Sequence, residues 1–284
     1  MQNEFFLNKE APEPQQFIGG WTSETADSQD YNEAVKLSDF IFERELGRGG
    51  FGKVWSAKSK RHSNNKRFAI KQISKEQNLR ETSVRNLLNE LDFMKRIKSD
   101  FVVNLNYALQ EERNLYLVMD LMTGGDLWQQ LKIRNGFREP VCKFFIACLI
   151  QALEAVHALD IVHKDIKPLN LVFDADGYLR LTDFGISKEL GPEGGELDGD
   201  QHGTPKYIAP EVLKRQKYGK SSDFWSVGIT LLELSGINKA PYMGENKEAI
   251  LEKMRKEKAF RLKQEDLPVG WSKQALHFIN KCLQ

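Results

Sequence analysis

The spacing of apolar residues changes at Leu121–Gly124, and this change constrains the fold more than any other feature of the chain. Before it lie short strand-like segments and one helical segment, and after it helical spacing dominates. The order predicts an α+β fold with two lobes, a small β-rich lobe followed by a larger, mainly helical one. A boundary at this point would leave a cleft between the lobes, which is a common place for a ligand site.

Local composition predicts the individual elements. Strands are expected at residues 40–46, 53–57, 67–73, 101–108 and 114–121, with a helix at 81–97. Beyond the boundary, helices are expected at 139–159, 221–234, 247–256 and 272–281, and strand-like pieces at 169–173 and 179–181. Residues 189–201 are rich in glycine and acidic side chains and are predicted to form a loop.

Composition excludes several classes of protein. The chain has 284 residues, and 41 Lys plus Arg balance 40 Asp plus Glu, so neither a nucleic acid nor an acidic membrane surface is an expected partner. The 29% of charged and 10% of aromatic residues exclude wholesale disorder. Residues 1–38 are the exception, because their polar, proline-containing composition predicts a flexible leader.

Cysteine usage and the chain start bear on location. Cys142, Cys148 and Cys282 form no CxxC pair and are expected to be unpaired thiols in a reducing compartment, the cytoplasm with the nucleus as a second candidate. The first residues lack the basic start and apolar run of a signal peptide. The longest apolar run, Phe144–Ile150, is too short for a membrane span, so none is expected.

The first candidate site is a glycine-rich stretch that contains Gly47, Gly49, Gly50 and Gly52. Glycines let backbone N–H groups approach a phosphate without an interfering Cβ, although a plain hairpin turn explains the stretch equally well. The glycines join two strands, which excludes a dinucleotide-binding fold, where they would join a strand to a helix. No Gly-Lys-Ser or Gly-Lys-Thr follows them, which excludes a P-loop protein.

Charged residues in apolar surroundings form the other candidate sites. Lys71 ends an apolar strand and either extends to solvent or reaches an anionic ligand while pairing with a carboxylate, for which Glu90 is the candidate. Asp165, Lys167 and Asn170 follow one another in a loop, and Asp183 opens an Asp-Phe-Gly triplet. The oxygens of Asn170 and Asp183 suit Mg²⁺ bound through nucleotide phosphates. Taken singly, these motifs are also common in ordinary charged loops and turns.

Taken in order, the motifs resemble those of the eukaryotic protein kinases. The resemblance covers about residues 38–284 and includes Thr204–Glu211 and Asp223–Gly228. Asp165–Pro168 and Gly203–Pro205 resemble the Ser/Thr subclass, and residues 114–120, 124–127 and 173–178 resemble the AGC group, in its cAMP-dependent and YANK-type branches. The resemblance implies a bilobal kinase domain at 39–284, with an N-lobe at 39–121 and a C-lobe at 122–284 that is incomplete at its C-terminus.

The resemblance also implies roles for individual residues. Asp165 would handle the proton of the substrate hydroxyl, Lys167 would steady the γ-phosphate, and Lys71, held by Glu90, would pair with the other phosphates. Asn170 and Asp183 would hold Mg²⁺. The residues implied to bind ATP are Leu46, Gly47, Gly49, Gly50, Phe51, Gly52, Val54, Ala69, Lys71, Met119, Asp120, Met122, Asp126 and Val172.

The implied function is transfer of the γ-phosphoryl group of Mg-ATP to Ser or Thr hydroxyls of protein substrates. The alternative is an inactive kinase-like scaffold, or a truncated fragment, that binds ATP or partners without catalysis. All six implied catalytic and metal-binding side chains are present, which favours the enzyme. Oligomeric state is left open.

The departures from the family pattern are informative. Lys164 stands where the family has an arginine that grips an activation-loop phosphate in a bidentate fork, which lysine cannot reproduce. Ser187 is the only hydroxyl residue between Asp183 and Thr204, so we hypothesise that acidic residues there partly replace a phosphate; an ordinary solvated loop is the alternative. The acidic residues are Glu189, Glu193, Glu196, Asp198 and Asp200.

Two further departures concern the substrate and the chain end. Asp126 and Glu233 match acidic positions that select a basic residue upstream of the target hydroxyl, but Leu169 replaces an acidic one, so weaker selection for arginine than in the cAMP-dependent kinase is expected. The chain ends before the arginine that pairs with Glu211 in the family, which predicts a truncated domain and a buried carboxylate without its partner.

Overall fold

The computed structural model describes residues 34–49, 52–62, 64–76, 81–134, 136–191, 195–199, 202–237, 241–242, 244, 247–256 and 260–284. The chain divides into two units. The first combines Met1–Leu91 with Val103–Met122, and the second combines Asp92–Val102 with Thr123–Gln284. Gly50, Phe51 and most of the predicted leader lie outside the described residues.

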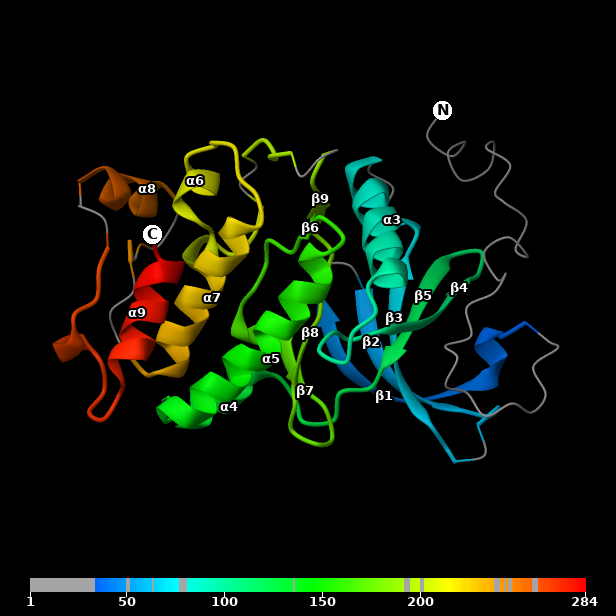
Figure 1. The fold of residues 1–284 in the computed structure, drawn as a ribbon. Helices are drawn as coiled ribbons and strands as arrows, with labels where there is room; N and C mark the ends of the chain where they lie inside the picture. The colour runs from blue at the N-terminus through cyan, green and yellow to red at the C-terminus, as the bar shows by residue number, and fades with distance from the viewer. Residues whose placement is uncertain are drawn as a thin grey trace. The chain divides into compact units, whose positions relative to one another are not determined.

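The first unit contains a five-stranded antiparallel sheet in the order β1-β2-β3-β5-β4 (Figure 1). Helix α3 (Glu81–Arg96) begins in this unit, and its last residues belong to the second. A short 3₁₀ turn, Leu37–Asp39, precedes the sheet. The strands are β1 (Phe40–Gly49), β2 (Gly52–Ser59), β3 (Arg67–Ser74), β4 (Leu105–Gln110) and β5 (Asn114–Asp120).

One face of this sheet carries its own apolar core. Side chains alternate between the two faces of a strand, so residues two apart in β3, such as Phe68 and Ile70, point to the same side. Both belong to a buried cluster that includes Phe40, whose ring meets Phe68 edge-on at 5.8 Å between centroids. Val35 and Leu37, which the sequence analysis assigns to the leader, pack against this cluster.

The second unit is mainly helical. Its helices are α4 (Leu127–Arg134), α5 (Glu139–His157), α6 (Pro210–Leu213), α7 (Ser221–Leu234), α8 (Lys247–Lys256) and α9 (Lys273–Cys282). Two small antiparallel pairs join β6 (Ile161–Val162) to β9 (Lys188–Glu189), and β7 (Leu171–Phe173) to β8 (Leu179–Leu181). Short 3₁₀ turns lie at Pro168–Asn170, Pro205–Tyr207 and Gln264–Asp266.

Helix α7 lies between α5 and α9 and is the centre of this unit (Figure 1). The apolar residues of α7 lie on most sides of the helix, and nearly all of them are buried. Helix α5, which also contacts β6 and β8, is the one helix in the described residues that is long and apolar enough to cross a membrane. Its packing inside the unit accounts for that composition, and the absence of a membrane span stays a prediction.

The predicted elements are largely confirmed, but several differ. The strand expected at 169–173 begins only at Leu171, after a 3₁₀ turn, and helices α4 and α6 were not predicted. The strand expected at 101–108 begins only at Leu105, because Phe101 O accepts a hydrogen bond from Leu181 N and Val102 bridges to Leu181 instead. The loop expected at 189–201 begins with a short strand, because Lys188 and Glu189 pair with β6. All three cysteines are buried and free, as expected.

Candidate active site

In the first unit, the strand register brings several predicted ATP-binding residues to one face of the sheet. Val54 lies opposite Lys71, and Ala69 lies opposite Met119. Residues opposite each other in an antiparallel pair share a face, as do residues two apart in one strand. The four side chains therefore lie on the face opposite the Phe68 cluster.

Lys71 is paired across this face with Glu90 of α3. Its Nζ donates to Glu90 Oε1 at 2.5 Å, and the two side chains are only 15% and 5% exposed. Helical spacing within α3 turns Glu90, which is buried, toward the sheet. A buried carboxylate next to a lysine fixes the position of the ammonium group.

The glycines at the β1–β2 turn serve different purposes. Gly52 has φ +147°, and a Cβ there would lie 1.9 Å from Gln72 O, so this position tolerates only glycine. At Gly47 a Cβ would meet nothing within 4 Å, so the backbone borders open space. Leu46 beside it is 41% exposed. Gly49 pairs with Gly52 at the end of the hairpin.

Asp120 closes β5, and two asparagines hold its side chain. Asn106 Nδ2 donates to Asp120 Oδ1 at 2.9 Å, and the backbone N–H of Asn104 donates to Oδ2 at 3.2 Å. The Asp120 N–H donates to Asn104 O, so its carbonyl is the remaining candidate for the predicted adenine contact. Met122, the next predicted contact, is the last residue of the first unit. Neither asparagine was predicted from the sequence.

In the second unit, three side chains converge on the Asp165 carboxylate. Lys167 Nζ donates to Oδ2 at 2.6 Å, Asn170 Nδ2 donates to the same oxygen at 2.9 Å, and Thr204 Oγ1 donates to Oδ1 at 3.2 Å. Lys167 Nζ also donates to Thr204 Oγ1 at 2.9 Å. Asp165 is 9% exposed, so these partners replace water around its charge.

Thr182 N donates to Asn170 O at 3.0 Å, which brings the next residue, Asp183, into the neighbourhood of Asn170. Asn170 Nδ2 donates to both Asp165 O and Asp165 Oδ2, which turns Asn170 Oδ1 away from Asp165. Asp183 has φ +71°, a left-handed conformation that is costly for a residue with a Cβ. An amide oxygen and a carboxylate form a hard donor set, so these residues fit a magnesium-type cation.

A buried aspartate that the sequence analysis gave no role holds the loop before Asp165. Asp223 of α7 is fully buried and accepts hydrogen bonds from the backbone N–H groups of His163 at 2.9 Å and Lys164 at 2.8 Å. His157 Nε2 lies 2.8 Å from its Oδ2. Burial lowers the pKa of His163, against the opposing effect of Asp223, which favours a neutral ring packed edge-on to Phe184.

Comparison with known proteins decides the family. A model of the protein kinase domain matches residues 40–284. The chain belongs to the protein kinase family. A probable serine/threonine-protein kinase of Dictyostelium discoideum is 40% identical over 228 residues, 80% of this chain and 49% of the relative. The cAMP-dependent protein kinase catalytic subunit of Arthrobotrys oligospora is 38% identical over 198 residues, 70% of this chain and 37% of the relative.

A more extended match is the ribosomal protein S6 kinase beta of Caenorhabditis elegans, 34% identical over 265 residues, 89% of this chain and 45% of the relative. This kinase and the cAMP-dependent kinase are members of the AGC group, so the similarity to Ser/Thr kinases of that group is confirmed. The chain spans less than half of the length of each of these relatives.

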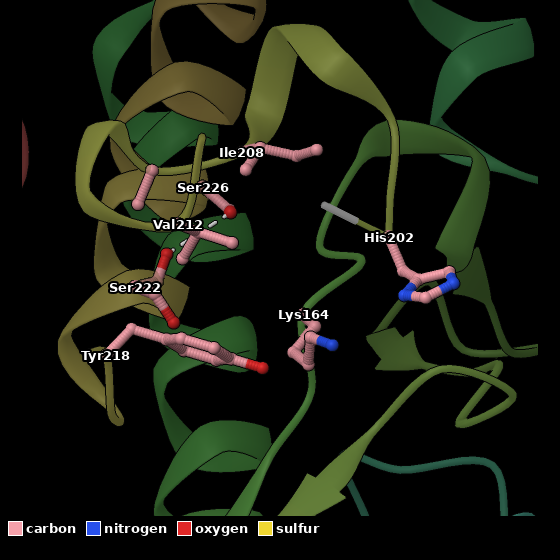
Figure 2. A pocket seen from close by; sticks show the side chains of 8 residues that line it. Lys164, His202, Ile208, Val212, Tyr218, Ser222 and Ser226 are labelled. Carbon is pink, nitrogen blue, oxygen red and sulfur yellow. Dashed lines mark hydrogen bonds between the residues drawn. The ribbon is translucent and has the colours of Figure 1, made fainter. Parts of the chain in front are cut away.

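Lys164, where the kinase family has arginine, borders a hollow that Val212, Tyr218 and Ser222 also line (Figure 2). Its Nζ lies 5.6 Å from the centroid of the Tyr218 ring. His202, which lies between Asp183 and Thr204 in the activation segment, also lines the hollow. Lysine offers an anion a point charge here, without the planar fork of arginine.

In the part of the kinase activation segment between Asp183 and Thr204, only one side chain carries a hydroxyl, and it is buried. Ser187 is 5% exposed, and its Oγ donates to His163 O at 3.1 Å. Of the acidic residues in the segment, Glu193 and Asp200 lie outside the described residues. Glu189 accepts hydrogen bonds from Arg96 at 2.7 and 3.0 Å, and these bonds lower the pKa of its carboxyl group.

Two carboxylates of the second unit, Asp126 and Glu211, differ in their surroundings from the sequence-based expectation. Asp126 bridges to Val172, and its carboxylate accepts from Gln129 N at 2.8 Å and Gln129 Nε2 at 2.9 Å, as a helix cap does. Glu211 is half-buried rather than buried, and within the described part of the chain no cation pairs with it. The predicted ATP-binding residues are thus divided between two units, and the cleft expected between the lobes stays a prediction.

Proposed function

We propose that this chain transfers the γ-phosphoryl group of ATP, in the presence of Mg²⁺, to Ser or Thr hydroxyls of protein substrates. One observation carries the proposal. The hydroxyl of Thr204 is bonded to both the Asp165 carboxylate and the Lys167 ammonium. An alcohol therefore already lies where a general base and a cation meet, which is the arrangement that proton removal from a substrate hydroxyl needs.

The roles of the site residues follow from their surroundings. Asp165 would accept or orient the proton of the substrate hydroxyl, and Lys167 would stabilise charge on the transferred group. Asn170 Oδ1 and the Asp183 carboxylate would hold the Mg²⁺ ion, which neutralises phosphate charge when bound. In the first unit, Lys71 would pair with ATP phosphates while Glu90 keeps the ammonium in place.

The rest of the ATP site is proposed from the family. Backbone at Gly47, Gly49 and Gly52 would cover the phosphates, and open space at Gly47 is compatible with this. Val54, Ala69 and Val172 would enclose the adenine, with Met119 beside it. We also propose a cytoplasmic location, which three free cysteines fit.

The test is transfer from Mg-ATP to a mixed Ser/Thr peptide pool by the untreated protein. The wild type is compared with Asp165→Asn and Asp183→Ala, with ATP binding measured on all three. We expect transfer by the wild type and a loss of at least about 100-fold in each variant, since each removes a group acting in the transition state. Transfer that survives Asp165→Asn would overturn the proposed role of Asp165. ATP binding without any transfer would favour the scaffold alternative.

A further inference from the structure

Next to the proposed phosphoryl-transfer residues, a carboxylate is occupied by a cation of the chain itself. Thr204, which is bonded to Asp165, leads directly into the 3₁₀ turn Pro205–Tyr207. In that turn, the ammonium of Lys206 is hydrogen-bonded to Glu233 Oε1 of α7. Lys206 is two residues from Thr204, so their Cα atoms are at most about 7.6 Å apart. When the hydroxyl of a substrate peptide is bonded to Asp165, a residue a few positions along that peptide can therefore reach Glu233.

The second oxygen of Glu233 is occupied as well. The Tyr207 hydroxyl donates to Glu233 Oε2 at 2.6 Å, and the tyrosine is 8% exposed. Ser226 Oγ donates to Tyr207 O at 2.8 Å, which fixes the turn on α7. Burial, with the charge of Glu233 adding to it, raises the pKa of Tyr207, so the hydroxyl keeps its proton and remains a donor.

The exposure of the pair decides what it can do for a substrate. The Glu233 side chain is 16% exposed and that of Lys206 is 36% exposed, so the carboxylate is shielded while the lysine faces solvent. An uncompensated carboxylate with so little solvent around it would attract a substrate arginine or lysine strongly. With Lys206 in place, the negative charge of Glu233 is neutralised. A substrate cation must displace Lys206 to reach Glu233, so the new ion pair is offset by the loss of the existing one.

We propose that Lys206 determines substrate specificity, by occupying the carboxylate of Glu233 and so removing selection for a basic side chain there. The inference rests on the proposed kinase function and deepens it. The substrate class is a Ser/Thr peptide without a required basic residue at the position that Glu233 faces. The sequence-based expectation of weakened arginine selection thereby acquires a cause. Asp126, the other acidic position, accepts hydrogen bonds from Gln129, which is neutral and leaves the charge of Asp126 in place.

The experiment scans a single arginine, against alanine, through every position of a Ser/Thr peptide. Within each protein variant, the ratio of kcat/KM for the arginine peptide to that for the alanine peptide is measured. We expect a ratio of no more than about threefold at the position facing Glu233 in the wild type, as for an exposed ion pair. Lys206→Gln should raise that ratio by about tenfold or more, the effect of a hydrogen bond to a charged group.

Three further variants separate specificity from a structural role. Lys206→Arg keeps the cation and should behave as the wild type. Lys206→Gln combined with Glu233→Gln should lose the new arginine preference. Lys217→Gln makes the same charge change at an exposed lysine and should leave every ratio unchanged. If Lys206→Gln alters all peptides equally, the pair only holds the turn on α7 and the inference is wrong.

Binding of the same peptides, with alanine replacing the target hydroxyl residue, is measured by fluorescence anisotropy. If no variant transfers phosphate but Lys206→Gln binds an arginine peptide about tenfold more tightly than the wild type does, the inference stands and the proposed function falls. If transfer occurs and neither binding nor transfer gains an arginine preference in Lys206→Gln, the inference falls and the proposed function stands.

Discussion

Leu197 of the activation segment and Tyr218, which lies between α6 and α7, exchange two backbone hydrogen bonds, Leu197 N to Tyr218 O at 2.8 Å and Tyr218 N to Leu197 O at 3.0 Å. Gly199 completes this attachment, because the backbone of Arg215 and Gln216 fills the place that a Cβ at Gly199 would take. Backbone contacts of this kind need no phosphate. They give a structural reason why residues 195–199 can stay attached in a segment whose one hydroxyl before Thr204, that of Ser187, is buried.

The attachment predicts a difference between two glycine variants. A Cβ at Gly199 would lie 2.5 Å from the Arg215 backbone, whereas one at Gly191 would meet nothing within 4 Å. Gly199→Ala should weaken the Leu197–Tyr218 bridge by about 1–3 kcal/mol, the usual effect of overpacking. Hydrogen exchange of residues 195–199 should then be about tenfold faster or more, with Gly191→Ala as the unchanged control. Equal exchange in both variants would show that the bridge does not hold the segment.

The Lys71–Glu90 pair predicts a loss of stability as well as of ATP binding. Glu90→Gln replaces a buried charged partner of Lys71, which is 15% exposed, by a neutral amide, so the free energy of unfolding should fall by about 3 kcal/mol. Urea denaturation measures this change, and ATP affinity should fall with it. The control is Glu45→Gln, which breaks an exposed pair with Arg48 and should have no measurable effect. A change of the same size in both variants would contradict the importance of burial.

Glu139 predicts a pH dependence of stability. It is 8% exposed, and its carboxylate accepts from Ser272 N at 2.6 Å, Ser272 Oγ at 2.5 Å and Lys143 Nζ at 2.7 Å, which ties α5 to the start of α9. Burial raises its pKa, but the bonds from Lys143 and Ser272 outweigh that effect, and the pKa lies below the ordinary value of 4.5. The stabilisation is therefore complete above pH 4.5 and is lost as the pH falls through the lowered pKa.

Glu139→Ala should lower the free energy of unfolding by about 2–3 kcal/mol at pH 7, the size expected for hydrogen bonds to a charged group. The gap between variant and wild type should shrink as the pH is lowered from 4.5. Denaturant titrations at neutral and acidic pH measure it, with Glu154→Ala, an exposed glutamate of the same helix, as the control. A gap that is equally large in acid would rule out the charged hydrogen bonds as its source.

The buried cysteines predict that the native protein does not react with thiol reagents. Burial raises the pKa of Cys142 to about 12 and that of Cys282 to about 11, and it raises the pKa of Cys148 as well. At pH 8 the reactive thiolate is then about one part in a thousand or less of each thiol whose pKa is given. A thiol reagent should add to no cysteine of the native chain and to all three in denaturant, as read by mass spectrometry. Labelling of Cys282 alone in the native chain would show that α9 opens locally.

The spacing of apolar residues along the chain was sufficient to predict most of the helices and strands. Alternation in β3 places Phe68 and Ile70 on one face and Ala69 and Lys71 on the other, as a strand reading of the sequence requires. The start of β4 could not be foreseen, since Phe101 and Val102 bond to Leu181, about 80 residues further along the chain. Patterns within a window of residues carry no information on such distant partners.

The sequence by itself determined the family, and it predicted the residues proposed here for phosphoryl transfer, because that chemistry requires particular side chains, such as Asp165, Asn170 and Asp183, at set intervals. Only the tertiary structure decided which charged side chains already have partners within the chain. Asp223 holds the backbone before Asp165, and Glu233 is occupied by Lys206. The strength of a charge depends on its distance to other charges and on its burial, and both arise from packing between segments that the sequence keeps far apart.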